Sequence, residues 1–428
     1  MTTARTGGSF AALSRADLAV LVPELLLCGQ LIDRSGMAHL ISAFGREGMA
    51  QVAIEEWQAA SPWYTRRMQR ALRYEGDDVV TIFKGLQLDI GAPPQFMDFR
   101  YRVDDRDHGE FWLDHCGALM DVEPLGDEYV MAMCHDIEDP TFDATALATN
   151  PHAQVRPIHR PPRVPADRHP HCAWTVTIDP SHVPPQVEPH TEALGRTAAV
   201  TTELSPIDGG GSDGEGSDGD GGGAHDYSGP LLSDLRFADF SKSALVRIAE
   251  EVCLQQHMLP LGFLMGVRNR TDEASALALT RKQLTGIAGI ASERIARALG
   301  APRSFAGLAA VLDVHPVFSP YQYVDRSIEH DQDGLTLRIH RRGGAHVDGA
   351  WPTLVDSDHL GALDALVRGV DAHFSVRVRS DTPDALVVGV VREETPAKES
   401  AEVAVTRFSS GTDFVFADRG IPLPLTVV

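Results

Sequence analysis

The chain has 428 residues, longer than one typical domain, and 43% of them are hydrophobic, which predicts a globular protein of two domains. Its formal net charge of −22 argues against non-specific binding to nucleic acid or anionic lipid, because both need a positive surface. No stretch reaches the ~18 apolar residues of a membrane span. Five cysteines, an odd number, without an export signal favour a cytoplasmic protein with reduced thiols over a disulfide framework.

The first part of the chain predicts helices followed by strands. Ser14 with Asp17 is a plausible capping box, and the residues after it have the i, i+3, i+4 apolar spacing of a helix. Residues 36–73 predict a further helix. After Leu88-Asp89-Ile90 the pattern changes to short, alternating, aromatic-rich runs, which are typical of strands. These runs are FRYRV, EFWLDH, EYVMAM and AWTVTI.

Residues 150–170 read NPHAQVRPIHRPPRVPADRHP and look like an insertion that the second part of the chain lacks. Its prolines favour an extended, stiff loop. In an acidic protein, a loop with four arginines is expected to close over an anionic substrate such as a carboxylate. Arg156, His159 and Arg160 are the predicted binding residues. The alternative is a surface loop whose arginines pair with local acids.

A Gly/Ser/Asp tract at 205–230 has almost nothing to bury and predicts a flexible, self-repelling linker, which we place at 191–230. A calcium β-roll is disfavoured because the tract lacks the apolar residue that each turn needs. Beyond the linker, residues 271–299 predict a helix. Three later runs predict strands: LTLRIH, HFSVRVR and ALVVGVV.

The two parts of the chain resemble each other. Matched positions follow in the same order: Cys28 and Cys253, Gln30 and Gln255, Arg70-Ala71-Leu72 and Arg297-Ala298-Leu299, Leu88-Asp89-Ile90 and Leu312-Asp313-Val314. We infer an internal tandem duplication, with a first repeat at 1–190 and a second, degenerate repeat at 231–428. Each repeat is expected to be α+β, with N-terminal helices before a small, mostly antiparallel sheet, and the two to form a pseudo-dimer within one chain.

Three of the five cysteines have a histidine neighbour, as His115-Cys116, Cys134-His135 and His171-Cys172, and each pair lies beside a predicted strand. Thiolate and imidazole are ligands that zinc and iron prefer. Because neighbours on a strand face opposite ways, the economical metal site uses Cys116, Cys134 and Cys172. His135 or His171 would then be a fourth ligand or proton carrier.

Asp136 is the candidate general base beside this site. The alternative is that the thiols are buried, the histidines lie on the surface without a shared site, and Asp136 is an exposed turn residue. In the second repeat, Cys116 aligns with Arg341 and Cys172 with Ala372, whereas Cys28 and Cys253 occur in both. Cysteines kept in both repeats indicate core positions, and cysteines confined to the first indicate function.

The order Cys116, Cys134 with Asp136 two residues on, a basic stretch, and Cys172-x-Trp174-x-Val176 resembles the L-2-amino-thiazoline-4-carboxylic acid hydrolase family. Vinyl-reductase-type small-molecule-binding domains look similar at the same level. The likeness covers about residues 15–180. It implies cleavage of a C–N bond in a small, carboxylate-bearing ring, with the three cysteines in or near the pocket.

These observations lead to three hypotheses for the function. The first is a metal-assisted hydrolase of a small anionic molecule, using zinc or iron at the cysteines, or one cysteine as nucleophile if no metal is bound. The second is a non-catalytic module that binds or senses a metal or ligand. The third is a scaffold protein. The sequence contains no phosphate-binding glycine loop, GxSxG elbow or HExxH motif, which disfavours nucleotide enzymes, serine hydrolases and zincins.

Overall fold

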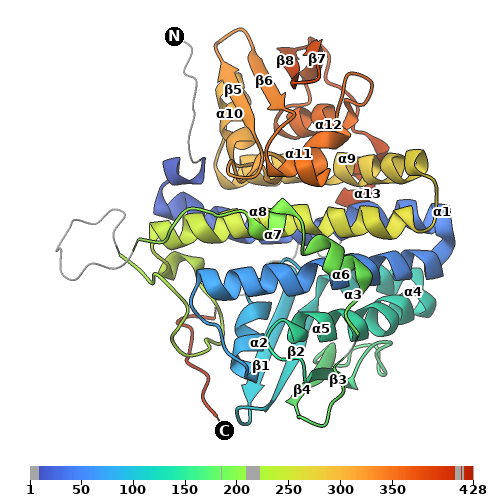
Figure 1. The fold of residues 1–428 in the computed structure, drawn as a ribbon, viewed down its shortest axis with the longest axis vertical. Coiled ribbons are helices and arrows are strands. Elements are labelled where there is room, and N and C mark those ends of the chain that lie inside the picture. The colour runs from blue at the N-terminus through green and yellow to red at the C-terminus, as the bar shows by residue number, and fades with distance from the viewer. Residues whose placement is uncertain (1–8, 185, 209–221, 410–415, 417–418, 428) are drawn as a thin grey trace.

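The computed structural model describes residues 9–184, 186–208, 222–409, 416 and 419–427. It has three layers, with long helices in the middle and one four-stranded sheet on each side (Figure 1). The first sheet belongs to the N-terminal half and the second to the C-terminal half. This arrangement confirms the predicted α+β class. None of the helices in the described part of the chain is long and apolar enough to cross a membrane.

The helical layer contains α1 (Arg15–Ala71), α8 (Lys242–Arg268) and α9 (Glu273–Ala298). Ser14 caps α1 as predicted, since its side chain accepts a hydrogen bond from the backbone N–H of Asp17 at 3.1 Å. Gly45 divides α1 because its φ of 72° is outside the helical region and is tolerated by glycine. We call 15–44 the first arm and 46–71 the second arm of α1.

The helices of one half pack on those of the other. Arg67 on the second arm of α1 pairs with Glu251 of α8 at 2.8 Å, and both side chains are buried. Arg294 of α9 pairs with Glu24 on the first arm at 2.6 Å. Gly262 lies so close to the second arm that a Cβ there would come within 2.8 Å of the Glu56 carbonyl oxygen. The pseudo-dimer interface is therefore a closely packed bundle of helical arms from both halves.

The two sheets share one topology. Each is antiparallel, with strand orders β1-β2-β4-β3 and β5-β6-β8-β7. The first contains β1 (Met97–Val103), β2 (His108–Cys116), β3 (Ala153–His159) and β4 (Cys172–Ile178). The second contains β5 (Arg326–His330), β6 (Leu335–His340), β7 (Phe374–Asp381) and β8 (Ala385–Arg392).

The shorter helices also recur. The first half has α2 (Val79–Leu86), α3 (Gly117–Val122), α4 (Asp127–Met131) and α5 (Glu138–Leu147), and the second has α10 (Phe305–Val314), α11 (Gly344–Asp348) and α12 (Gly361–Val370). Asp143 of α5 accepts a hydrogen bond from the Val155 amide at 2.9 Å, and Asp364 of α12 accepts one from Val376 at 3.0 Å. Such matched contacts support the duplication beyond the order of elements.

The strand register corrects two of the predicted equivalences. Cys172 lies opposite Leu113, and Leu386 lies opposite Ile339 at the matching place, so Leu386 and not Ala372 corresponds to Cys172. Cys116 is the N-cap of α3, and Gly343 is the N-cap of α11, so Gly343 and not Arg341 corresponds to Cys116. The predicted alignment is displaced because the connections between strands differ in length in the two halves. Neither cysteine recurs in the second half.

Three expected segments differ from the prediction. EYVMAM (128–133) is not a strand: it lies in α4 and a π-helical segment, Ala132–Ile137, that leads into α5. Asp127 and Glu128 begin α4, where carboxylates favour a helix N-terminus. Residues 150–170 are not one loop, because β3 occupies 153–159. The insertion is the β3–β4 connection at 160–171, whose counterpart between β7 and β8 is 382–384.

The predicted linker is partly helical, although its central part, 209–221, lies outside the described residues. It begins with α6 (Pro189–Leu194) and continues with α7 (Ala198–Thr201). Trp63 of α1 donates a hydrogen bond from Nε1 to the Thr191 carbonyl oxygen at 2.7 Å, which holds α6 on the second arm. The N-terminal amides of α7 bind Asp348 of α11 at 2.8 and 2.9 Å. This segment therefore connects the two halves through specific contacts.

The C-terminal segment crosses back to the first half. After α13 (Ala401–Arg407), the Ser409 hydroxyl donates a hydrogen bond to Asp121 of α3 at 2.5 Å. Further on, Leu425 donates its amide to the Leu231 carbonyl oxygen at 2.7 Å. Each half thus sends the segment after its sheet across to the other half.

Candidate functional site

The structure brings the three predicted metal-binding cysteines into one region. Cys116 ends β2, Cys134 lies in the π-helical segment and Cys172 begins β4, and all three are buried. Burial raises the pKa of the Cys116 thiol to about 12 and that of Cys134 and Cys172 well above its usual value. The nearby Glu138 carboxyl raises all three further. The thiols are therefore neutral at physiological pH.

The arrangement of these residues does not fit zinc or iron. Nucleophilic attack needs a thiolate, which a positively charged environment favours. After burial, the largest influence on each of these thiols is instead the carboxyl of Glu138. In the described ranges, no group of three or more His, Cys, Asp or Glu side chains is arranged to hold a metal ion. Cys116 has a structural role, since its Sγ accepts a hydrogen bond from the Leu119 amide at 3.4 Å.

The predicted acid–base residues do not share a site. His135 Nε2 lies 2.7 Å from the Pro161 carbonyl oxygen, so this ring fastens the β3–β4 connection. Asp136 beside it is exposed. His171 is buried, with its ring centroid 5.8 Å from that of His115 and 5.2 Å from that of His169. Burial, and then Arg163, lower its pKa to about 4, so the ring is neutral at physiological pH.

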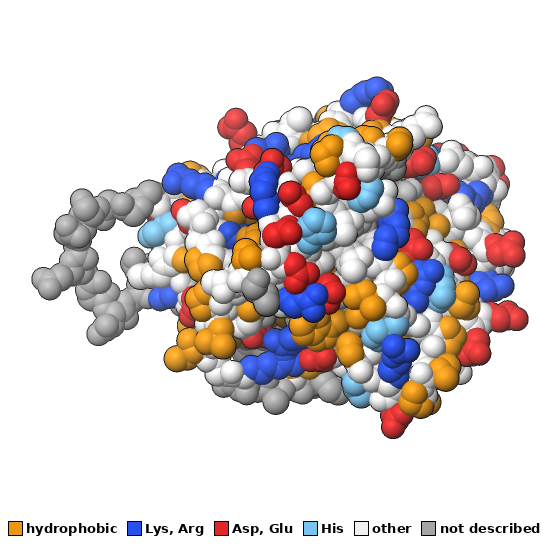
Figure 2. Space-filling view, turned by 90° about the horizontal axis from the view of Figure 1, so that it is seen from below, with side chains coloured by type: hydrophobic (Ala, Val, Ile, Leu, Met, Phe, Trp, Pro, Cys, Tyr) orange, Lys and Arg blue, Asp and Glu red, His pale blue; other side chains and the backbone are white. Residues whose placement is uncertain are grey.

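The predicted anion-binding residues are engaged with local acids or half-buried. Arg156 binds Asp143 at 2.9 Å, and Arg160 forms an ion pair with Asp139. His159 is half-buried, and burial lowers its pKa. Positive and negative side chains are likewise interspersed over the face of the first half seen from below (Figure 2). The contacts match the surface-loop alternative rather than a lid over an anion.

A buried cavity in the first half, which the sequence analysis did not single out, gathers the polar groups instead. It lies between α1, the first sheet and α5, has a volume of about 80 Å³, and we call it the inner cavity. Gln30, Asp33 and Arg34 line it from the first arm of α1, Tyr64 from the second arm, and Glu138 from the start of α5. Trp57 and Phe142 complete its wall with aromatic rings.

Three buried polar atoms on the wall of the inner cavity have no hydrogen-bond partner among the described residues: Gln30 Oε1, Arg34 Nε and Glu138 Oε2. Each such atom costs roughly 1–3 kcal/mol, so native proteins rarely leave several together. The Arg34 guanidinium lies 3.6 Å from Asp33 and 3.8 Å from Asp121, too far for hydrogen bonds. It contacts the sulfurs of Met37 at 3.3 Å and Met133 at 3.8 Å, which are weak acceptors.

Burial raises the pKa of each of three carboxyl groups of the inner cavity, Glu138 most of all. Burial and then Asp139 raise the pKa of Glu138 to about 8, against the opposing charges of Arg160 and Arg34. At pH 7 Glu138 is therefore mainly protonated and can donate a hydrogen bond. Burial raises the pKa of Asp89 to about 6, although the Gly91 amide at 2.7 Å and the Tyr64 hydroxyl at 2.8 Å hydrogen-bond to it. Burial also raises the pKa of Asp33.

The second half keeps Gln255 and Asp313 at the positions of Gln30 and Asp89 but lacks other members of this polar set. The helix match defined by Cys28 and Cys253 places Met258 and Leu259 where the first half has Asp33 and Arg34. Matching the helix ends at Leu72 and Leu299 places Ala291 at the position of Tyr64. Thr141 of α5 also lines the inner cavity, and the Asp143–Asp364 match places Ala362 at its position. Because the fold is the same in both halves, its packing does not require these polar residues. The two halves therefore differ at these positions while keeping the same sheet topology.

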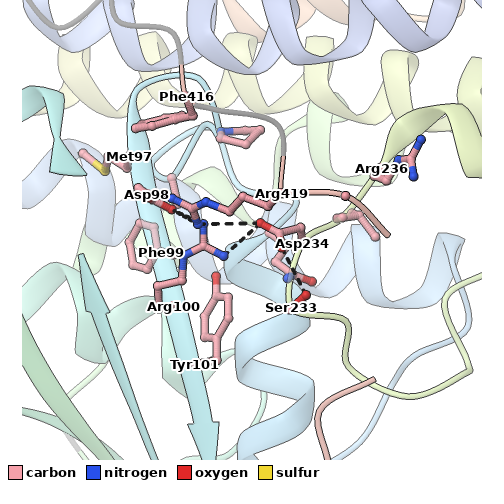
Figure 3. Close-up of a pocket in the computed structure, with 15 residues that line it drawn as sticks. Met97, Asp98, Phe99, Arg100, Tyr101, Ser233, Asp234, Arg236, Phe416 and Arg419 are labelled. Carbon is pink, nitrogen blue, oxygen red and sulfur yellow. Dashed lines mark hydrogen bonds and ion pairs between the residues drawn. The ribbon is translucent and has the colours of Figure 1, made fainter. Parts of the chain in front are cut away.

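A larger pocket of about 230 Å³ lies at the edge of β1 and is shown in Figure 3. Arg100 binds Asp98 at 2.7 Å and Asp234 at 2.9 Å, and Arg419 from the C-terminal segment binds Asp98 at 2.9 Å. The dashed lines in Figure 3 connect these charges into one network. Arg236 also lines the pocket but belongs to none of these ion pairs. The network holds Arg419 of the C-terminal segment on the first half.

The chain matches no protein-family model, no curated protein and no solved structure.

Proposed function

We propose that the chain binds a small carboxylate in the inner cavity of its first half, between Arg34 and Glu138. The observation that carries the proposal is the convergence on one cavity of three buried polar atoms that make no hydrogen bond within the described residues, from helices far apart in the sequence. The proposal keeps the small anionic ligand expected from the sequence. It moves the site from the cysteines, His135, His171 and the arginine loop to α1 and α5.

The chemistry of the wall favours a carboxylate. Arg34 supplies a guanidinium N–H that makes no hydrogen bond and that has only long ion pairs, with Asp33 at 3.6 Å and Asp121 at 3.8 Å, to exchange for a ligand. Protonated Glu138 supplies a second donor without a repelling charge. Gln30 Oε1 is an acceptor, which suits a ligand that also carries a hydroxyl or amino group. A cavity of about 80 Å³ admits only a few non-hydrogen atoms, so the polar part of the ligand is small.

A catalytic form of this function rests on Glu138. Its pKa of about 8 is close to physiological pH, where a carboxyl group can both give and take a proton. Hydrolysis of a small carboxylate-bearing molecule, as the family resemblance implies, would use Glu138 as general acid. The proposal includes no step at the cysteines or at a metal.

The test is calorimetric titration with acetate and propionate, with acetamide and propionamide as uncharged controls. We expect the carboxylates to bind more tightly than the amides. Arg34→Met should weaken carboxylate binding about 10- to 100-fold, because a charge-assisted hydrogen bond contributes about 1.5–3 kcal/mol. The matched control is Arg156→Ala, which removes an exposed arginine bound to Asp143 and should leave binding unchanged. Equal binding of acids and amides would refute the proposal.

The pH dependence provides a second test that does not depend on the Arg34 variant folding. As pH rises through about 8, Glu138 loses its proton and its charge repels the ligand, so carboxylate binding should weaken. Glu138→Gln keeps a donor but cannot ionise, and its binding should stay constant between pH 7 and 9. A loss of affinity with the same pH profile in both proteins would remove Glu138 from the site.

A further inference from the structure

A second pocket adjoins the inner cavity and is mainly apolar, with Arg34, Asp121 and Ser409 as the polar part of its wall. It has a volume of about 170 Å³, lies between the first arm of α1, α3, α4 and α13, and we call it the outer pocket. Met37, Ala38, Ile41, Met49, Val122 and Leu125 form much of its wall. Apolar side chains at its edge are exposed, 55% for Leu125 and 86% for Phe408. The outer pocket thus offers an accessible apolar surface beside a polar interior.

The same two side chains line both spaces. Arg34 and Met133 belong to the wall of the inner cavity and to that of the outer pocket. The hydrogen bonds of the Arg34 guanidinium go to thioether sulfurs, at 3.3 and 3.8 Å, and its ion pairs with Asp33 and Asp121 are long, at 3.6 and 3.8 Å. Methionine is unbranched and adapts its shape at low cost. A small movement of these side chains would join the two spaces.

From this arrangement we infer that the ligand is an unbranched aliphatic monocarboxylate, whose carboxylate binds Arg34 in the inner cavity and whose hydrocarbon chain lies in the outer pocket. The inference rests on the proposed function and specifies its ligand. The positive charge of Arg34 lies at the boundary between the polar and the apolar walls. The corresponding boundary in the ligand is the bond between its carboxylate and its hydrocarbon chain. The methionines Met37, Met49 and Met133 suit a flexible chain better than a rigid ring.

The second half supports a specific role for the outer pocket. In the helix match, Gly262 and Gly266 take the positions of Met37 and Ile41. A Cβ at Gly262 would lie 2.8 Å from the Glu56 carbonyl oxygen, and one at Gly266 would lie 2.9 Å from the Glu55 carboxylate. In the second half, α8 therefore packs directly on the second arm of α1 where the first half has the outer pocket. The larger apolar side chains that wall the outer pocket are a feature of the first half.

The experiment measures binding of propionate, hexanoate and octanoate by calorimetry below the concentrations at which they aggregate. Burial of each added methylene should strengthen binding about fourfold, because it contributes about 0.8 kcal/mol. 1-Octanol, which has the chain without the charge, should bind much more weakly than octanoate. Ala38→Phe fills the outer pocket from a half-buried position and should abolish the gain with chain length while propionate binding stays unchanged.

The outcomes separate the inference from the proposed function. Propionate binding without any gain for octanoate would overturn the inference and leave the proposed function intact. Absence of binding by every carboxylate would overturn both. An octanoate gain that persists in Ala38→Phe would place the chain elsewhere and overturn the inference. If Ala38→Phe does not fold, Leu125→Asp at the exposed edge should weaken octanoate binding alone, and equal affinity in this variant would also overturn it.

Discussion

Glu138→Gln is expected to change the pH dependence of folding stability in a defined direction. Burial raises the pKa of Glu138 from its ordinary value of 4.5 to about 8, so the folded protein holds this proton more tightly than the unfolded chain. The stability that the protonated group contributes is fully present below about 4.5 and is lost as pH rises through about 8. At about 1.36 kcal/mol per pKa unit, the loss amounts to roughly 3–5 kcal/mol by pH 9.

The assay is urea unfolding of wild type and Glu138→Gln at several pH values from 4.5 to 9. The difference in unfolding free energy between the two proteins should shift steadily in favour of Glu138→Gln over this range. Taking the difference cancels other raised groups such as Asp33 and Asp89. Glu128→Gln, at an exposed position of α4, is the matched control and should give a flat difference. A flat difference for Glu138→Gln would show that its pKa is not raised and would refute the reasoning.

Two further predictions concern the pseudo-dimer interface and the thiols. Arg67→Met leaves Glu251 paired with Arg247 alone and removes the donors to the Val200 and Thr202 carbonyl oxygens, so it should cost about 2–4 kcal/mol of unfolding free energy. Arg268→Met breaks only the exposed pair with Glu273 and should cost less than about 1 kcal/mol. Similar losses in both variants would contradict the buried interface. All five cysteines should resist iodoacetamide at pH 8 in the native protein and react after unfolding, because all five are buried. Elemental analysis of the wild type and of Cys134→Ser should show no stoichiometric zinc or iron that is lost in the variant. Rapid native alkylation of Cys116, Cys134 or Cys172, or stoichiometric metal lost in that variant, would restore the cysteine site.

The duplication and most strands could be predicted because core residues repeat with the period of the element that buries them. The alternation in AWTVTI, for example, matches the alternating burial of β4. EYVMAM failed because a short apolar run fits a strand and a buried helical turn equally well. Cys172 was matched to Ala372 instead of Leu386 because the β3–β4 connection is much longer than the β7–β8 connection. A single sequence does not show where such a difference in length should be placed in the alignment.

The candidate site was harder to predict. The neighbouring His and Cys residues predicted a shared site. However, neighbours on a strand face opposite sides. Burial is sufficient to explain why cysteines occur at these three positions. Arg34 and Glu138 lie far apart in the chain and meet only because α1 and α5 cover the same sheet face. The sequence did contain one indication of the inner cavity, because Asp33 and Arg34 directly follow a long apolar run in α1. Burying charged side chains there costs desolvation free energy unless they have partners.

The crossing of the two halves explains how one of them could diverge from the other. Asp348 in the second half holds α7 from the first, and Asp121 in the first half is bound by Ser409 from the second. In a dimer of identical subunits, every substitution acts at both sites at once, and a weakened interface releases the partner. Fusion into one chain keeps the partner at a high effective concentration and lets the copies diverge. The second half could then become a dedicated structural subunit, free to replace Asp33 and Arg34 by Met258 and Leu259 while still completing the fold that supports the inner cavity.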